Sequence, residues 1–289
     1  MKGKLLGIAA IAALIGTPAL AADMPVKAPP APASSWTGFY VGGEAGYGWE
    51  EQAVNQVPND PAAAMLFSGA IGFAAEQPIP GSYKVDRTGA VGGFEAGYNW
   101  QSGPNWVWGL ETDFNFSGIN GQASGTSVIQ GPPAATFLQT TTSQQNTDWY
   151  GTVRDRLGYL ATPNLLLYGT GGLAYGRVAD TANLIVTGPS GALVRVRAGG
   201  FSFSCTANVT CFSGTASSVR TGWTTGAGAE WMFNRHWSAK IEYQFVDLGS
   251  DTMRVVANTL PVPSTALSSF NATFRDAINV VRVGANYHF

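Results

Sequence analysis

The chain has 289 residues, of which 12% are charged, 12% are aromatic and 37 are glycine. Charged residues make up about a quarter of a typical soluble protein, so this composition favours a β-protein whose surface faces something other than water. Without a leader that contains Lys2 and Lys4, 14 basic and 18 acidic residues remain, and this balance argues against a nucleic-acid partner.

The N-terminal residues have the pattern of a secretory signal peptide. Lys2 and Lys4 precede an apolar run at residues 5–15, and small residues suitable for cleavage follow. The run is too short to span a membrane as a helix. We therefore expect residues 1–21 to be a signal peptide and residues 22–35, rich in Pro and Ala, to be an extended periplasmic linker.

Apolar and polar side chains alternate along seven stretches of the remaining domain, residues 36–289, and an eighth stretch, 164–177, is Gly-rich with an ambiguous facing. In the last stretch Val281 and Val283 share one face with the C-terminal Phe289, whereas Arg282 lies on the other face. Strict alternation indicates a β-strand between two different surroundings. The eight predicted strands are 37–50, 87–101, 105–118, 148–161, 164–177, 220–233, 236–248 and 274–289.

The connections between these strands alternate between long and short without exception. The long ones are 51–86, 119–147, 178–219 and 249–273, and the short ones are 102–104, 162–163 and 234–235. This asymmetry is typical of an outer-membrane barrel, and lipid tolerates no unpaired sheet edge. The sequence therefore predicts an all-β fold, an eight-stranded antiparallel up-and-down transmembrane β-barrel. Its four long loops would be extracellular, and its short turns and both termini would be periplasmic.

Aromatic residues gather near the ends of the predicted strands, where the girdles of a membrane barrel lie at the two lipid interfaces. The predicted girdle comprises Trp49, Trp100, Trp106, Trp108, Trp149, Trp223, Trp231, Trp237 and Tyr287. All nine Trp of the chain, including Trp36, lie at or near such ends.

Two segments carry a resemblance to a known family. The first is WTGFYVGG at residues 36–43, after the Pro-rich segment, and the second is GTVRDRLGY at residues 151–159. Together with the strand pattern, the chain resembles the small outer-membrane barrels of alphaproteobacteria, the major surface antigens related to RopB and to OmpA-like eight-stranded barrels. The resemblance implies a Gram-negative outer-membrane location in contact with membrane lipids and lipopolysaccharide. It also implies that the barrel-assembly machinery recognises the closing strand and its terminal Phe289.

One residue departs from this family pattern. Asp155 falls on the apolar face of its predicted strand, at a position where the family usually has a small residue. A carboxylate that faces lipid costs up to a few kcal/mol near the midplane and less near an interface. Either Asp155 lies close to an interface, or the strand faces differently at this point.

The inward faces of the predicted strands collect charged residues of both signs. They are Glu44, Glu95, Glu111, Asp113, Arg154, Arg156, Glu230, Lys240, Glu242 and Arg282. An eight-stranded barrel has an interior that side chains can fill, and opposite charges in it should pair. We therefore expect a structural charge network in the lumen, with a narrow porin for small solutes or ions as the alternative.

The sequence offers little for catalysis, metal binding or a cofactor, and we expect none of these. His236 and His288 are the only histidines, and both belong to the predicted periplasmic rim. Cys205 and Cys211 share the third long loop, and two cysteines in an exported chain suggest a disulfide.

The expected role is structural, at the cell surface. A second alternative is binding of haemin or a host factor through the loops. Tyr83 or Met253 could serve as a haem ligand in principle, and Arg195 and Arg197 could touch lipopolysaccharide phosphates, although a solvated loop face is the preferred explanation of these arginines.

Overall fold

The structure is a computed structural model, and it describes residues 35–68, 80–131, 135–259 and 265–289. The predicted signal peptide and, apart from Ser35, the predicted linker lie outside the described residues. Within these four ranges, no helix has the length and apolar character to cross a membrane.

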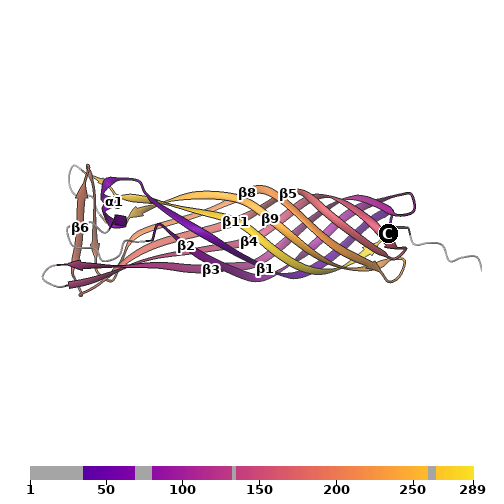
Figure 1. The fold of residues 1–289 in the computed structure, drawn as a ribbon, viewed down its shortest axis with the longest axis horizontal. Coiled ribbons are helices and arrows are strands. Elements are labelled where there is room, and N and C mark those ends of the chain that lie inside the picture. The colour runs from indigo at the N-terminus through magenta and orange to yellow at the C-terminus, as the bar shows by residue number, and fades with distance from the viewer. Residues whose placement is uncertain (1–34, 69–79, 132–134, 260–264) are drawn as a thin grey trace, which may run out of the picture. The chain divides into compact units, whose positions relative to one another are not determined.

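Eight strands form a closed barrel in which each strand pairs with the next along the chain (Figure 1). They are β1 (Gly38–Pro58), β2 (Ser82–Ser102), β3 (Trp106–Gly131), β4 (Ala135–Thr162), β5 (Leu165–Thr187), β8 (Val209–Met232), β9 (Trp237–Ala257) and β11 (Ser269–His288). The last strand closes the barrel against β1, from the pair Tyr40 and His288 to the pair Pro58 and Phe270. All eight barrel pairings are antiparallel, so the predicted fold is confirmed.

The predicted long loops are wrong in extent, because the barrel strands continue far into them. Most of the predicted loop 119–147 is the far half of the β3–β4 hairpin, whose pairing extends to Gly131 and Ala135. This stretch is rich in Thr, Ser, Gln and Asn, so neither face is consistently apolar. Period-2 alternation can be recognised only where one face of a strand is apolar. The pattern disappears where the strands extend beyond the membrane, although their backbone pairing continues.

Further elements lie at the end of the barrel away from the C-terminus (Figure 1). They are α1 (Pro61–Ser68) and a three-stranded sheet of β10 (Ala266–Leu267), β7 (Phe201–Thr206) and β6 (Leu193–Ala198). We call these elements the cap and their end of the barrel the cap end; the opposite end, with the short connections, is the turn end. The Asp60 carboxylate caps α1 by accepting from Ala63 N at 2.9 Å, and it also accepts from Ser269 N at 2.7 Å. It thereby ties α1 to the start of β11.

The outward face of the barrel carries an apolar belt between two groups of aromatic side chains. Near the turn end lie Trp100, Trp106, Trp108, Trp231, Trp237, Tyr287 and Phe289, and further along lie Trp49, Trp149 and Trp223. Neighbouring strands hold these rings together, as in the stacked pair Trp100 and Trp108 with centroids 4.3 Å apart. Trp36 is different, because it is fully buried inside the barrel. Trp36 lies next to the start of β1, near a strand end as expected, but it is not part of the girdle.

Asp155 faces outward, on the turn-end side of the belt. It is exposed on β4. Tyr159 lies four residues away toward the turn end, and Trp149 lies six residues away toward the cap end. Register places Trp108 of the turn-end aromatic group beside Leu157, two residues along β4 from Asp155, which at about 3.3 Å per residue and a strand tilt of about 40° is about 5 Å. The strand therefore faces as predicted, and the carboxylate lies close to the turn-end aromatic level, as the first of the two sequence-based explanations requires.

Candidate functional site

Near the turn end, the barrel interior holds a cluster of charged side chains, which we call the inner ionic layer. It contains Glu44, Glu95, Glu111, Asp113, Arg154, Arg156, Glu230, Lys240, Glu242 and Arg282, all of them buried. The structure thus brings together every residue that the sequence assigns to the lumen. They meet because each occupies an inward position of its strand and the barrel closes these positions on one another.

Two arginines bridge the carboxylates on different strands. Arg282 on β11 lies 2.8 Å from Glu242 and 3.1 Å from Asp113, and it also pairs with Glu44. Arg154 on β4 lies 3.0 Å from the same Asp113 and also pairs with Glu242. Both arginines contact Asp113 and Glu242, so removing either arginine would leave these two carboxylates with one cation fewer.

The other two cations extend this network around the barrel. Lys240 pairs with Glu95, and Arg156 pairs with Glu230 and lies 3.7 Å from Glu111. The guanidinium of Arg156 also lies 3.7 Å from the centre of the Tyr168 ring, within the range of a cation–π contact. Every cation of the inner ionic layer therefore has more than one partner.

The inner ionic layer contains six carboxylates and four cations, an excess of two carboxylates. Phenolic hydroxyls supply additional donors, because Tyr40 donates to Glu111 at 2.5 Å and Tyr168 donates to Glu242 at 2.8 Å. Such hydrogen bonds lower the cost of burying negative charge. The layer is therefore a connected network of ion pairs and hydrogen bonds.

A serine, a histidine and a glutamate meet at the turn-end side of this layer. His288 Nε2 lies 2.9 Å from Ser238 Oγ and 3.3 Å from Glu230 Oε1. A catalytic triad needs the carboxylate on the other ring nitrogen, so that it orients the imidazole toward the serine. Here Nε2 faces both groups, and Ser238 donates directly to Glu230. All three side chains are also buried, so this geometry does not match a hydrolase.

A second buried charge cluster, the outer ionic layer, lies toward the cap end and was not predicted. It contains Glu50, Arg87, Asp180, Arg220 and Asp276. Arg87 lies 2.9 Å from Asp276, and Arg220 pairs with both Asp180 and Asp276. A sequence signal existed: Glu50 has the parity of Glu44, and Arg87 has that of Glu95, so the ends of the predicted strands already place both residues on the inward face.

Asp180 lies beyond the apolar belt, three residues past the outward-facing Arg177. Burial, together with the nearby Asp276 carboxylate, raises the pKa of Asp180 to about 6, and Arg220 opposes this shift. Desolvation disfavours the charged form of an acid, so Asp180 titrates near neutral pH.

Three apolar layers separate and enclose the ionic layers. The turn-end layer contains Trp36, Val107, Leu160, Leu166, Tyr168 and Met232. The middle layer contains Val91, Ile119, Tyr150, Ala174, Val178, Val246, Leu248, Ile278 and Val280. At the cap end, barrel and cap side chains such as Leu66, Phe203 and Phe270 form one larger cluster. The interior thus alternates between apolar and ionic sections.

Trp36 anchors the turn-end layer. Its indole N–H donates to Pro163 O at 3.1 Å, and its backbone N–H donates to Gln101 Oε1 at 3.1 Å. The ring lies edge-on to His288 with centroids 5.9 Å apart. The buried Trp36 side chain therefore reaches from the residues before β1 across the mouth of the barrel to the β4–β5 connection.

The remaining predicted residues lie in or near the cap. Cys205 and Cys211 form a disulfide, and both are buried in the cap-end cluster. Met253 is buried in the same cluster, and the Tyr83 hydroxyl contacts Ser143 Oγ at 2.6 Å, so neither is presented as a haem ligand.

Two further features concern ligands at the surface. Arg195 and Arg197 lie on the exposed face of β6. Within the part of the chain that the structure describes, no cluster of three or more His, Cys, Asp or Glu could hold a metal ion.

Comparisons with known proteins agree with this architecture. The family model of the outer membrane protein beta-barrel domain matches residues 8–289. The 31 kDa outer-membrane immunogenic protein of Brucella melitensis biotype 1 is 35% identical over 298 residues, covering 100% of both chains. The 22 kDa outer membrane protein of Rhizobium leguminosarum bv. viciae is 27% identical, covering 78% of this chain and 70% of the relative.

Among solved structures, the outer membrane protein OprG from Pseudomonas aeruginosa aligns with a TM-score of 0.38 and 12% identity, covering 88% of this chain and 97% of that one. The family match covers nearly the whole chain, and the 31 kDa relative matches it from end to end. The chain belongs to the outer membrane β-barrel protein family and is similar to outer membrane proteins of alphaproteobacteria.

Proposed function

We propose that the protein is a closed outer-membrane barrel with a structural and surface role in the cell envelope, and that it is not a porin. The observation that carries this proposal is the alternation of three apolar and two ionic layers in the interior. A porin keeps a polar, water-filled channel from end to end. Here an ion would have to cross three apolar sections, one of them closed by a fully buried Trp36.

The proposed orientation places the turn end and both termini in the periplasm and the cap outside the cell. Outer-membrane barrels have short periplasmic turns and longer extracellular connections, which match the two ends of this barrel. The curated relatives in Brucella are named immunogenic, which supports an exposed cap. Membrane lipids and lipopolysaccharide would surround the belt, and the barrel-assembly machinery would recognise the strand that ends at Phe289.

Catalysis and haem binding gain no support from the described geometry. Ser238 and His288 are buried without the orientation of a triad, and Met253 lies inside the cap-end cluster. Arg195 and Arg197 do face outward, but they hydrogen-bond no specific group among the described residues that would define a site.

Liposome swelling tests whether the barrel is closed to small solutes. Purified mature protein is inserted into vesicles, and a temperature-dependent shift in gel mobility shows that it is folded. We expect vesicles diluted into small sugars or amino acids to swell no faster than protein-free vesicles. Swelling that slows as the solute grows would show a water-filled pore and overturn the proposal.

A further inference from the structure

Asp155 faces outward, and no cation among the described residues lies beside it. Its outward neighbours along β4 are the apolar Val153 and Leu157. Register pairs Asp155 with Leu110 on β3 and with Gly171 on β5, neither of which can neutralise a carboxylate. A charged side chain in a membrane usually marks a site with a partner, and here the partner would come from the surrounding lipid.

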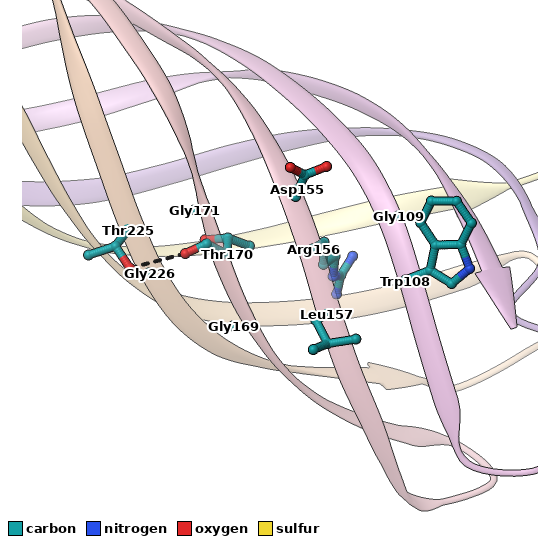
Figure 2. Close-up of a pocket in the computed structure, with 10 residues that line it drawn as sticks. All are labelled: Trp108, Gly109, Asp155, Arg156, Leu157, Gly169, Thr170, Gly171, Thr225 and Gly226. Carbon is teal, nitrogen blue, oxygen red and sulfur yellow. Dashed lines mark hydrogen bonds between the residues drawn. The ribbon is translucent and has the colours of Figure 1, made fainter. Parts of the chain in front are cut away.

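A groove in the outer wall of the barrel lies next to this carboxylate (Figure 2). It has a volume of about 690 Å³, and its floor is the outward face of β5, where Gly169 and Gly171 carry no side chain. Register places Asp155 on β4 and Thr225 on β8 on either side of Gly171. Two strand spacings, about 10 Å, therefore separate the backbones of Asp155 and Thr225. The groove thus combines an open floor with a polar side chain on each side.

Both polar side chains of the groove accept hydrogen bonds. An ionised Asp155 is an acceptor, and the Thr225 hydroxyl already donates its hydrogen to Thr170 O at 3.1 Å, which leaves its oxygen as an acceptor. Arg156 also lines the groove, but its guanidinium is buried in the inner ionic layer and pairs with Glu230. A negative charge with acceptors on both sides is complementary to a primary ammonium, which is a cation with three donors.

The depth of the groove suits a lipid headgroup. Gly169 pairs with Leu157, which pairs with Trp108 of the turn-end aromatic group, so one end of the groove lies at the level of the lipid interface. Asp155 lies two residues deeper, which is about 5 Å. A phosphate at the interface level can therefore hold an ammonium, on a linker as short as that of ethanolamine, beside the carboxylate.

We propose that this groove binds the headgroup of a phospholipid that carries a primary ammonium. The ammonium lies over Gly171 and donates to the Asp155 carboxylate and to Thr225 Oγ1, and the phosphate stays at the level of Trp108. The choice of a phospholipid rests on the proposed orientation, in which the turn end meets the leaflet that faces the periplasm.

Native mass spectrometry of the purified protein in detergent micelles tests this site. Phosphatidylethanolamine and phosphatidylcholine with identical acyl chains are added separately. Both headgroups are zwitterionic, but the trimethylated nitrogen of phosphatidylcholine has no N–H to donate. We expect phosphatidylethanolamine to bind about tenfold more tightly, because hydrogen bonds to charged groups are the strong ones. The result does not depend on which way the barrel inserts, so failure of the lipid site and failure of the proposed orientation are distinguishable.

Asp155→Asn removes the charge and keeps the shape of the side chain. We expect the preference for phosphatidylethanolamine over phosphatidylcholine to disappear in this variant. The matched control is Asp86→Asn, because Asp86 is an exposed carboxylate on β2 that lies on the cap side of the register of Trp49. This control should keep the preference, and a gel-mobility shift on heating shows that each variant is folded.

Gly171→Leu fills the groove without touching the carboxylate. A Cβ added at Gly171, or at the exposed Gly43 on β1, would come no closer than 3.9 Å to any atom beyond its chain neighbours. Both positions therefore accept a side chain, and Gly43→Leu is the control outside the groove. We expect Gly171→Leu to lower phosphatidylethanolamine binding by about tenfold and Gly43→Leu to leave it unchanged. Equal binding of the two lipids, or an undiminished preference in Asp155→Asn or Gly171→Leu, would overturn the proposed site.

Discussion

Replacing Arg282 by Gln tests whether the inner ionic layer holds the barrel together. Arg282 is fully buried and contacts Glu44, Asp113 and Glu242, and the substitution changes the layer from four cations facing six carboxylates to three facing six. Removing one partner of a buried ion pair typically costs about 3–5 kcal/mol, because it leaves charge that is desolvated and unpaired. We expect a loss of this size in the free energy of unfolding.

The measurement is urea unfolding of the barrel from lipid vesicles, followed by tryptophan fluorescence and by the gel-mobility shift. The matched control is Arg177→Gln, which breaks the 3.5 Å pair with Asp148, whose two side chains are 53% and 47% exposed. An exposed pair of this kind contributes at most about 1 kcal/mol.

A double variant checks the cause of the expected loss. Adding Asp113→Asn to Arg282→Gln removes one of the orphaned carboxylates and should recover about 0.5–3 kcal/mol, the usual coupling between contacting groups. If Arg282→Gln costs no more than Arg177→Gln, or if Asp113→Asn makes the loss larger, the inner ionic layer is not a mutually compensating network.

Three further predictions concern other parts of the chain. Trp36→Ala should destabilise the barrel by about 3–5 kcal/mol, the usual cost of truncating a buried aromatic side chain, in the same urea assay. Cys205→Ser should lower cap stability by about 2 kcal/mol, since a short disulfide loop restricts the unfolded chain, and limited proteolysis should then cut the cap while the belt strands stay protected. Because the pKa of Asp180 is raised to about 6, folding favours its protonated form. The contribution of Asp180 to the free energy of unfolding is therefore largest at low pH and is lost as pH rises through 6. The stability of the natural protein relative to Asp180→Asn should therefore increase from pH 7 to pH 4, by at most about 3 kcal/mol, and a constant difference across this range would contradict the assignment.

Alternation predicts the strands correctly wherever lipid and lumen differ in polarity. The facing of β1 and β11 is as predicted, and the inward parity of residues such as Glu44 and Arg282 is enough to place them in the inner ionic layer. The Gly-rich β5 could not be assigned from the sequence, because Gly169 and Gly171 carry no side chain that distinguishes one face from the other.

Features beyond the belt could not be predicted by the same route. The outward face there is polar, so the strand extensions lose the period-2 signal, and Asp180 of the outer ionic layer lies in one of them. The cap depends on contacts between residues far apart in the chain, such as Phe67 with Phe270, whose ring centroids are 5.3 Å apart. The burial of Trp36 could not be predicted, because a tryptophan near a strand end can lie either in the girdle outside the barrel or inside the barrel mouth. Only the closed barrel shows that Trp36 lies inside.

The central claim is that the interior is closed by apolar layers, and single-channel recording in planar bilayers tests it most directly. Folded, purified protein should give no stable conductance steps above the background of the bare membrane. Reproducible ohmic steps, with an ion selectivity that changes when Arg154 or Glu111 is replaced, would show that ions pass through the ionic layers and would contradict the closed barrel.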